Sequence, residues 1–170
     1  MKIIVIYYSY SGNTQEVSLI LSEYLKEKGE VGIVELKGLD ESNKFFSQVI
    51  RALQHKKAKV QPVSFDLSGY DLICLGTPVW AFGPAPAVNT YLEQCSGVGG
   101  KEVVLYATYG SGTGKERCLN YMQKILAEKG AKAFKRFFIQ QGKVTDREFV
   151  LSKIKEILPL SFDCGSGQGH

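Results

Sequence analysis

The feature that most constrains the fold is the start of the chain, where an apolar run stops abruptly in a short loop of hydroxyls and glycine. Residues 3–8 are β-branched and aromatic and do not alternate with polar residues, which predicts a strand buried on both faces. A strand of this kind belongs to a parallel sheet with helices on both sides. We therefore expect an α/β protein.

The loop that follows, residues 9–14, has the composition of an anion site. Ser9, Ser11 and Thr14 supply three hydroxyls, and Gly12 permits a tight backbone. Asn13 or Thr14 is expected to cap a helix, whose free N–H groups and positive dipole end would attract an anion such as phosphate. The alternative is a simple strand-to-helix turn, but capping would explain one of these residues and not three hydroxyls.

The rest of the chain alternates between strand and helix patterns. Strands are expected at 31–36, 71–76, 101–109 and 132–139, and helices at 13–28, from 40 or 42 to 53, from 84 or 86 to 92, at 115–128 and at 146–158. Lys135 and Arg136 interrupt the last strand, which is typical of a sheet edge. We predict one domain over residues 1–160 with helices on both faces of the sheet, and a flexible tail at 161–170.

Composition excludes several classes of function. The net charge of +4 is mild and spread along the chain, which does not favour a nucleic-acid partner. A local basic cluster is expected to be a solvated helix end, or else a docking surface for an acidic redox partner or a dinucleotide phosphate; its members are Arg51, His55, Lys56, Lys57 and Lys59. No apolar stretch is long enough for a membrane span and no export signal precedes the first strand, so we expect a cytoplasmic location.

The few cysteines and histidines make metal or nucleophilic catalysis hard to assemble. Cys74, Cys95, Cys118 and Cys164 show no C-x-x-C spacing, so we expect ordinary buried or surface thiols and no metal site. With two histidines in the whole chain, a Ser-His-Asp hydrolase is also disfavoured. We assign no catalytic side chain.

Three of the predicted strands end in unusual loops, which should share one crevice at the carboxyl edge of the sheet. The second loop, 77–83, carries Trp80 and Phe82 behind Pro78, and the third, 108–114, carries Tyr109 among glycines. An anion socket beside two aromatic loops indicates a phosphorylated ligand with a flat, conjugated ring. Each aromatic side chain could instead serve the core, a turn or an interface.

The glycine-rich third loop does not fit the common nucleotide motifs. Residues 110–115 have three residues between the outer glycines and Glu116 after the lysine, so they do not form a P-loop. The spacing also departs from G-x-G-x-x-G, and the loop follows the fourth strand and not the first. ATP hydrolysis and a Rossmann NAD site are therefore not supported.

These motifs resemble the flavodoxin family. Residues 9–14 (SYSGNT) are similar to its [ST]-x-[ST]-G-x-T phosphate loop, and residues 76–83 and 108–112 to its two ring-binding loops. The resemblance implies a flavodoxin-like three-layer sandwich, with a five-stranded parallel sheet in the order 2-1-3-4-5 and non-covalent FMN at its carboxyl edge. The implied cofactor-binding residues are Ser9, Tyr10, Ser11, Gly12, Asn13, Thr14, Pro78, Val79, Trp80, Ala81, Phe82, Gly83, Thr108, Tyr109, Gly110, Ser111 and Gly112.

What the resemblance implies about function has two forms. The first is an FMN-binding electron-transfer protein that shuttles electrons between a reductase and an acceptor protein. The alternative is an FMN-dependent NAD(P)H or quinone reductase acting on a small molecule, which the absence of strong acidity and the open third loop favour. A monomer or a homodimer is compatible with either form.

Overall fold

The computed structural model describes residues 1–37 and 64–159. The described strands are β1 (Lys2–Tyr7), β2 (Glu30–Glu35), β3 (Leu72–Trp80), β4 (Gly83–Pro84), β5 (Glu102–Tyr109) and β6 (Ala133–Gln140). The helices are α1 (Asn13–Leu25), α3 (Pro86–Gln94), α4 (Lys115–Glu128) and α5 (Arg147–Ile157), with a short 3-10 turn, η1 (Gln141–Lys143). The helix expected between residues 40 and 53 and the basic cluster around His55 lie outside the described residues.

The main sheet is parallel and runs in the order β2-β1-β3-β5-β6. This confirms the predicted order of the five long strands. The sheet also contains a strand that the sequence did not predict: β4 is two residues long and pairs with the end of β3 in an antiparallel hairpin. Strand β3 consequently continues through residues that were expected to form a loop.

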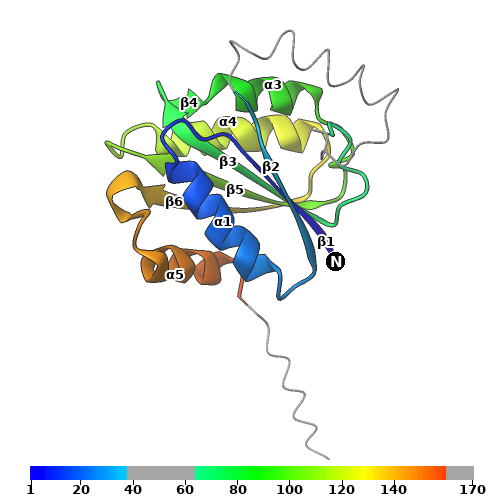
Figure 1. Ribbon diagram of the computed structural model, residues 1–170. Helices are drawn as coiled ribbons and strands as arrows, with labels where there is room; N and C mark the ends of the chain where they lie inside the picture. Colours follow the sequence, from blue (N-terminus) through cyan, green and yellow to red (C-terminus); the bar gives the residue numbers. More distant parts are fainter. Residues whose placement is uncertain (38–63, 160–170) are drawn as a thin grey trace, which may run out of the picture.

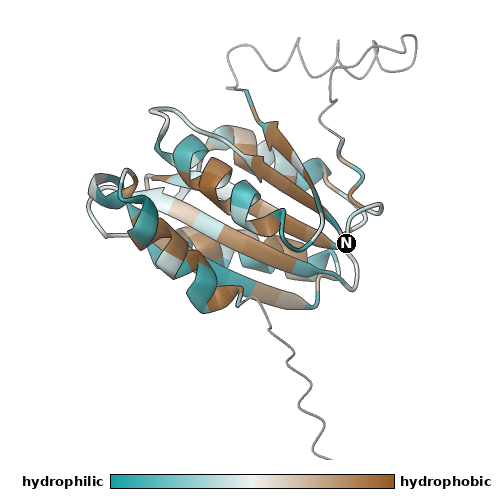
Figure 2. Cartoon of the chain, turned by 60° about the horizontal axis from the view of Figure 1, so that its bottom comes forward, coloured by the Kyte–Doolittle hydropathy of each residue, from teal (hydrophilic) through white to brown (hydrophobic). Residues whose placement is uncertain are grey.

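Two apolar layers hold the helices on the sheet. Strand residues alternate between them, because successive side chains of a strand point to opposite faces. Ile4 and Ile6 of β1 pack with α3 and α4, whereas Ile3 and Val5 pack with α1 and α5. Figure 1 shows the two helix pairs on either side of the sheet, and Figure 2 shows the apolar character of the central strands between them. The three-layer sandwich is therefore confirmed.

A close contact between neighbouring central strands fixes the packing below the site. Tyr106 of β5 is fully buried and stacks on Phe137 of β6, with ring centroids 5.2 Å apart. A Cβ atom on Gly76 of β3 would lie 2.2 Å from the Tyr106 ring. Because no side chain fits there, glycine at position 76 lets a large ring fill the space beside β3.

The edge strand behaves as the sequence predicts. β6 lies at the end of the sheet order, and its two cations are paired: Lys135 with Glu102 at 3.1 Å and Arg136 with Glu116 at 3.1 Å. Charges on an edge strand discourage pairing with another sheet.

The described cysteines are all buried, and burial raises the pKa of the Cys118 thiol to about 12. No helix within residues 1–37 and 64–159 is long and apolar enough to cross a membrane.

Candidate functional site

The phosphate loop, residues 9–14, joins β1 to α1 and lies at the carboxyl edge of the sheet. Helix α1 begins at Asn13, and its N-cap is Gly12 with a φ of 85°. The expectation that Asn13 or Thr14 caps the helix is therefore wrong. The Asn13 side chain instead donates to Ser11 Oγ at 3.1 Å. No side chain caps α1, so the N–H groups of its first turn remain available to an anion.

Two features of this loop fit a phosphate. Ser9 Oγ is buried and has no hydrogen-bond partner among the described residues, which is unusual for a polar atom and indicates a missing acceptor or donor. A Cβ atom on Gly12 would meet nothing within 4 Å, so open space lies beside the helix start. Oxygen atoms of a bound phosphate could occupy this space and pair with the serine hydroxyl.

Buried hydroxyls tie the phosphate loop to the base of the third loop. Thr14 Oγ1 and Thr108 Oγ1 are 2.8 Å apart, and each residue is 1% exposed. Ser18 Oγ donates to the Thr14 carbonyl at 2.6 Å and lies 2.6 Å from the Tyr106 hydroxyl. This network fixes α1 relative to β5. It also places the Thr108 hydroxyl against Thr14, on the phosphate side of the site.

The second loop is a hairpin, which we call the ring hairpin and define as residues 77–84. Val79 pairs with Pro84 and Trp80 with Gly83, which leaves Ala81 and Phe82 as a two-residue turn. Their φ values are 45° and 70°. Positive φ at both positions is typical of a type I′ turn, where Asn and Gly are the usual residues. Alanine and phenylalanine are strained in this region, so other contacts must hold the turn in place.

Two contacts hold the ring hairpin. At its base, the Thr77 hydroxyl accepts from the Ala85 N–H at 2.9 Å and donates to the Pro78 carbonyl at 2.9 Å. At its tip, Phe82 packs on Gly114, the N-cap of α4, where a Cβ atom would lie 2.9 Å from Phe82 Cα. The hairpin is therefore fastened to the third loop.

Aromatic rings connect the ring hairpin to the phosphate loop. Trp80 meets Tyr8 and Tyr10 edge to face, with ring centroids 5.7 Å away in each case. Trp80 remains 39% exposed and Tyr10 79% exposed. Burial, and secondarily the nearby Tyr10, raise the pKa of Tyr8, so this phenol stays neutral at physiological pH. The rings form an exposed apolar surface beside the phosphate loop.

A hollow of about 190 Å³ separates the ring hairpin from the third loop. It is lined by Val79, Ala81, Phe82, Tyr109, Gly110, Ser111 and Thr113. Gly112 lies against the Tyr109 ring, and Gln140 of β6 donates to the Gly110 carbonyl at 3.4 Å. The hollow has aromatic side chains on both walls and backbone groups at its rim, as a flat conjugated ring requires.

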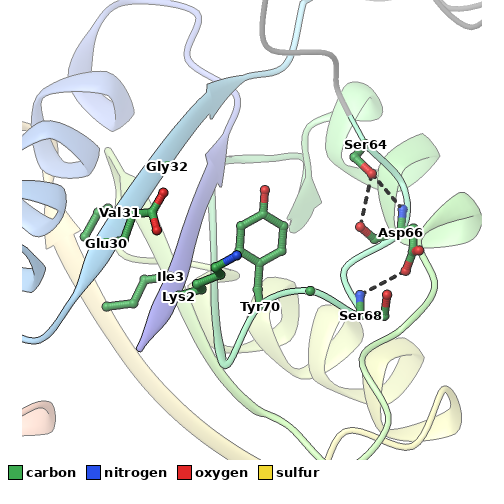
Figure 3. Close-up of a pocket in the computed structure, with 10 residues that line it drawn as sticks. Lys2, Ile3, Glu30, Val31, Gly32, Ser64, Asp66, Ser68 and Tyr70 are labelled. Carbon is green, nitrogen blue, oxygen red and sulfur yellow. Dashed lines mark hydrogen bonds between the residues drawn. The ribbon is translucent and has the colours of Figure 1, made fainter. Parts of the chain in front are cut away.

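A larger hollow, of about 450 Å³, lies at the opposite end of the strands (Figure 3). Lys2 and Glu30 line it from the starts of β1 and β2, and Tyr70 lines it from the turn before β3. Ser64, Asp66 and Ser68 also line it, and the two serines are bound to Asp66 within a local turn. Because ligands of open α/β sheets bind at the carboxyl ends of the strands, this hollow is not the candidate site.

The structure brings most of the predicted residues to one edge, but in different roles. Of the predicted residues, Pro78 is buried within β3, and Trp80, Gly83, Thr108 and Gly112 do not line the ring hollow. Sequence reasoning missed Tyr8, Thr113 and Gly114. Tyr8 was assigned to the buried strand, although it directly precedes the hydroxyl loop; the contact of Gly114 with Phe82 carries no sequence signal.

The sequence profile of a family described as NADPH-dependent FMN reductase matches residues 1–144, which is most of the chain. The chain belongs to this family. Its membership indicates FMN as the cofactor. No curated protein is similar enough in sequence to count as a relative.

Solved structures with the same fold include both reductases and flavodoxins. An apo NADH:FMN oxidoreductase (EMOB) has a TM-score of 0.69 at 15% identity, covering 92% of this chain and 86% of its own. Oxidised flavodoxin 1 from Bacillus cereus has a TM-score of 0.60 at 18% identity, and the match covers 91% of this chain and 98% of the flavodoxin. A flavoprotein from Lactobacillus acidophilus NCFM, solved with FMN, has a TM-score of 0.54 at 22% identity, and the match covers 86% of this chain and 98% of the flavoprotein. At these identities the likeness shows the flavodoxin-like fold.

The residues present fit FMN. Ser9, Ser11 and the start of α1 would hold its phosphate, and the walls of the ring hollow, Phe82 and Tyr109, would hold its ring. When bound, FMN supplies hydride and electron transfer chemistry. The chain contributes binding and orientation, and its neutral phosphate loop leaves the phosphate charge uncompensated by any lysine or arginine within residues 9–14.

Proposed function

We propose that this protein is an FMN-dependent reductase that takes its electrons from NADPH and passes them to a small-molecule acceptor. The observation that carries the proposal is the match of the NADPH-dependent FMN reductase family over residues 1–144. The similarity to structures described as an NADH:FMN oxidoreductase and as azoreductase AzrA supports the same function. The alternative set out from the sequence is thus better supported than an electron carrier.

The geometry of the site is compatible with this chemistry. Hydride transfer between a nicotinamide and a flavin requires close stacking and exclusion of water, and it needs no additional acid or base on the protein. Phe82 is 50% exposed beside the ring hollow, and Trp80 and Tyr10 are exposed on its phosphate side. These apolar surfaces can orient a second flat ring over the flavin. The Tyr8 phenol, whose pKa is raised by burial from a value already well above neutral pH, adds no charge there.

An electron carrier is the second candidate. The similarity in fold to flavodoxin 1 from Bacillus cereus favours it, because a protein of that name shares this architecture at nearly its full length. A carrier needs an exposed flavin edge and a partner protein, and it does not need a nucleotide site. The two candidates use the same cofactor and differ in what reduces it.

Anaerobic reduction separates the two candidates. The purified FMN-loaded chain is mixed with NADPH, and the absorbance of oxidised flavin is followed over time. A reductase loses this absorbance in a single reduction of its FMN by NADPH without any other protein, and it recovers the absorbance when a quinone is added as acceptor. Reduction only by dithionite or by a separate flavoprotein reductase would identify the protein as a carrier and overturn the proposal.

A further inference from the structure

A third hollow, of about 400 Å³, runs along the outer edge of β6 and shares Tyr109 with the ring hollow. We call it the β6 groove. Its lining comes from the end of β5, the start of α4, β6, η1 and α5 and is rich in aromatic rings and cations: Tyr109, Lys115, Arg136, Phe137, Phe138, Gln140, Lys143, Phe149, Lys153, Glu156 and Ile157. The proposed function does not account for this groove.

Two of the four cations in the groove are already paired. Arg136 is bound to Glu116 at 3.1 Å and to the side chain of Asn120, and Lys153 lies 2.9 Å from Glu156. Lys115 and Lys143 have no carboxylate within 4 Å in the part of the chain that the structure describes. The groove therefore presents two lysines whose charge is not compensated by an acidic side chain.

Aromatic rings hold these two lysines. Lys115 Nζ lies 4.5 Å from the centroid of Tyr109 and 5.4 Å from that of Phe138, and Lys143 Nζ lies 5.9 Å from that of Phe149. A ring face attracts an ammonium group without using up its hydrogen-bond donors. Each lysine is thus positioned and still able to donate to an anion.

The lysines lie at the end of the groove that adjoins the third loop. Lys115 directly follows Gly114, and Lys143 ends η1, which follows Gln140, the residue that donates to the Gly110 carbonyl. A ligand in the groove could therefore extend past Tyr109 toward the ring hollow. The volume is within the usual range of 300–1,000 Å³ for small-molecule sites. The aromatic walls suit a stacked nucleotide base, and the two lysines without a carboxylate partner suit a phosphate.

Resting on the proposed function, we propose that the β6 groove binds the adenosine 2′-phosphate end of NADPH, with Lys115 and Lys143 donating to the 2′-phosphate. The nicotinamide end then extends past Tyr109 toward the flavin, whose ring lies in the ring hollow. NADH lacks this phosphate, so the two lysines determine the preference between the nucleotides. An acidic protein partner would not need the aromatic walls or the proximity to the ring hollow.

The test measures the half-saturating concentrations of NADPH and NADH for flavin reduction in the FMN-loaded full chain. Lys143→Gln and Lys115→Gln are each expected to lower the preference for NADPH over NADH about tenfold, since a charge-assisted contact to phosphate contributes roughly one factor of ten or more. Lys143→Arg keeps the charge and should retain most of the preference. Lys124→Gln removes the same charge from an exposed position on α4 and should change the preference less than about twofold.

The outcomes separate this proposal from the proposed function. Equal changes for both nucleotides, or no change in the Lys143 and Lys115 variants, would overturn the groove assignment and leave the reductase in place. If neither nucleotide reduces the wild-type flavin, the proposed function fails, and calorimetry with adenosine 2′,5′-bisphosphate and 5′-AMP decides the groove. Tighter binding of the bisphosphate that is lost in Lys143→Gln supports the groove; equal binding of the two compounds, or none, overturns it.

Discussion

The phosphate loop and the ring hairpin follow neighbouring strands of the sheet, and they are built in opposite ways. The phosphate loop consists mainly of small polar residues, with the exposed ring of Tyr10 among them, and its positive φ falls on Gly12. The ring hairpin carries exposed aromatic rings, and its positive φ values fall on Ala81 and Phe82. The backbone of the phosphate loop is unstrained because glycine occupies its positive-φ position. The backbone of the ring hairpin is strained and is held in place by contacts with neighbouring segments.

The contacts of Trp80 with Tyr8 and Tyr10 connect the two loops, but each loop is also held by separate bonds of its own. Two buried bonds fix the phosphate loop: Thr14 Oγ1 is bonded to Thr108 Oγ1, and the Thr14 carbonyl accepts from Ser18 Oγ. The ring hairpin depends on Thr77 at its base and on the contact between Phe82 and Gly114 at its tip. A substitution in one loop should therefore affect one end of the cofactor more than the other.

The largest effect is expected from removing two hydroxyls of the phosphate loop. Ser9→Ala combined with Ser11→Ala should weaken FMN binding about 100-fold, because each charge-assisted hydrogen bond to phosphate contributes about 1.5 kcal/mol or more. Riboflavin, which lacks the phosphate, should be affected less than about threefold. Both dissociation constants are measured by quenching of flavin fluorescence on titration with the apoprotein.

Ser9→Ala alone gives a stricter control. Ser9 Oγ has no partner among the described residues, so its removal should leave the stability of the apoprotein unchanged or slightly higher. Equal losses for FMN and riboflavin, or a clear loss of apoprotein stability, would show that this serine does not face the phosphate.

A smaller effect is expected from the bond between Thr14 and Thr108, which links the phosphate loop to the third loop. Thr108→Val leaves Thr14 Oγ1 buried without its partner and should weaken FMN about fivefold more than riboflavin. Thr108→Ser keeps the hydroxyl and should restore binding. Ser22→Ala is a matched control, because it removes a buried hydroxyl bond on the same helix at a distance from the loop. If Ser22→Ala shifts the ratio equally, Thr108 acts only through stability.

Exchanging glycine and alanine at the positions of positive φ should lower the free energy of unfolding in the phosphate loop and raise it in the ring hairpin. Gly12→Ala places a Cβ in open space but at a φ of 85°, so the free energy of unfolding should fall by about 1 kcal/mol. Ala81→Gly relieves a φ of 45° and should raise it by up to about 1 kcal/mol. Gly142→Ala, without a positive φ or a close contact, should be neutral. Denaturant unfolding of the apoprotein measures all three, and changes of equal sign at positions 12 and 81 would contradict the comparison.

The smallest effect concerns alkaline pH. Burial raises the pKa of Tyr8 above its ordinary value of 10, so the phenol stays protonated in the folded chain while it ionises in the unfolded chain. Its contribution to stability is complete below pH 10 and is lost as the pH rises above 10 toward the folded pKa. Denaturant unfolding at pH 9 and pH 11 should show a smaller alkaline loss in Tyr8→Phe than in wild type. An identical loss would show that the Trp80 surface does not shelter Tyr8.

Much of the fold could be read from local patterns. The unbroken apolar run of β1 and the charged residues in β6 predicted a central and an edge strand, because burial on two faces and exposure at an edge leave direct marks on composition. Helix α4 begins and ends as predicted. The helix cap at Gly12 was missed, because a glycine cap supplies no side chain to recognise.

The ring side of the site was harder to predict, because its geometry depends on distant contacts. Residues 77–80 contain proline and were expected to form a loop, yet they extend β3: Thr77 and Pro78 pair with β5, and the last two residues pair with β4. The Ala81–Phe82 turn lacks the Asn or Gly that marks a tight hairpin, so β4 carried no local signal. The role of Lys115 and Lys143 in the β6 groove could likewise not be predicted, because it depends on contacts with aromatic rings of other elements.

The sequence by itself determined the parallel α/β architecture, the strand order implied by the family resemblance and the hydroxyl-rich phosphate loop. These features depend on local composition and on the alternation of strands and helices. The bond between Thr108 and Thr14, the packing of Phe82 on Gly114 and the presence of both Lys115 and Lys143 in the β6 groove emerge only from the tertiary structure. Such contacts join residues far apart in the chain, and packing selects them after the strands have been placed.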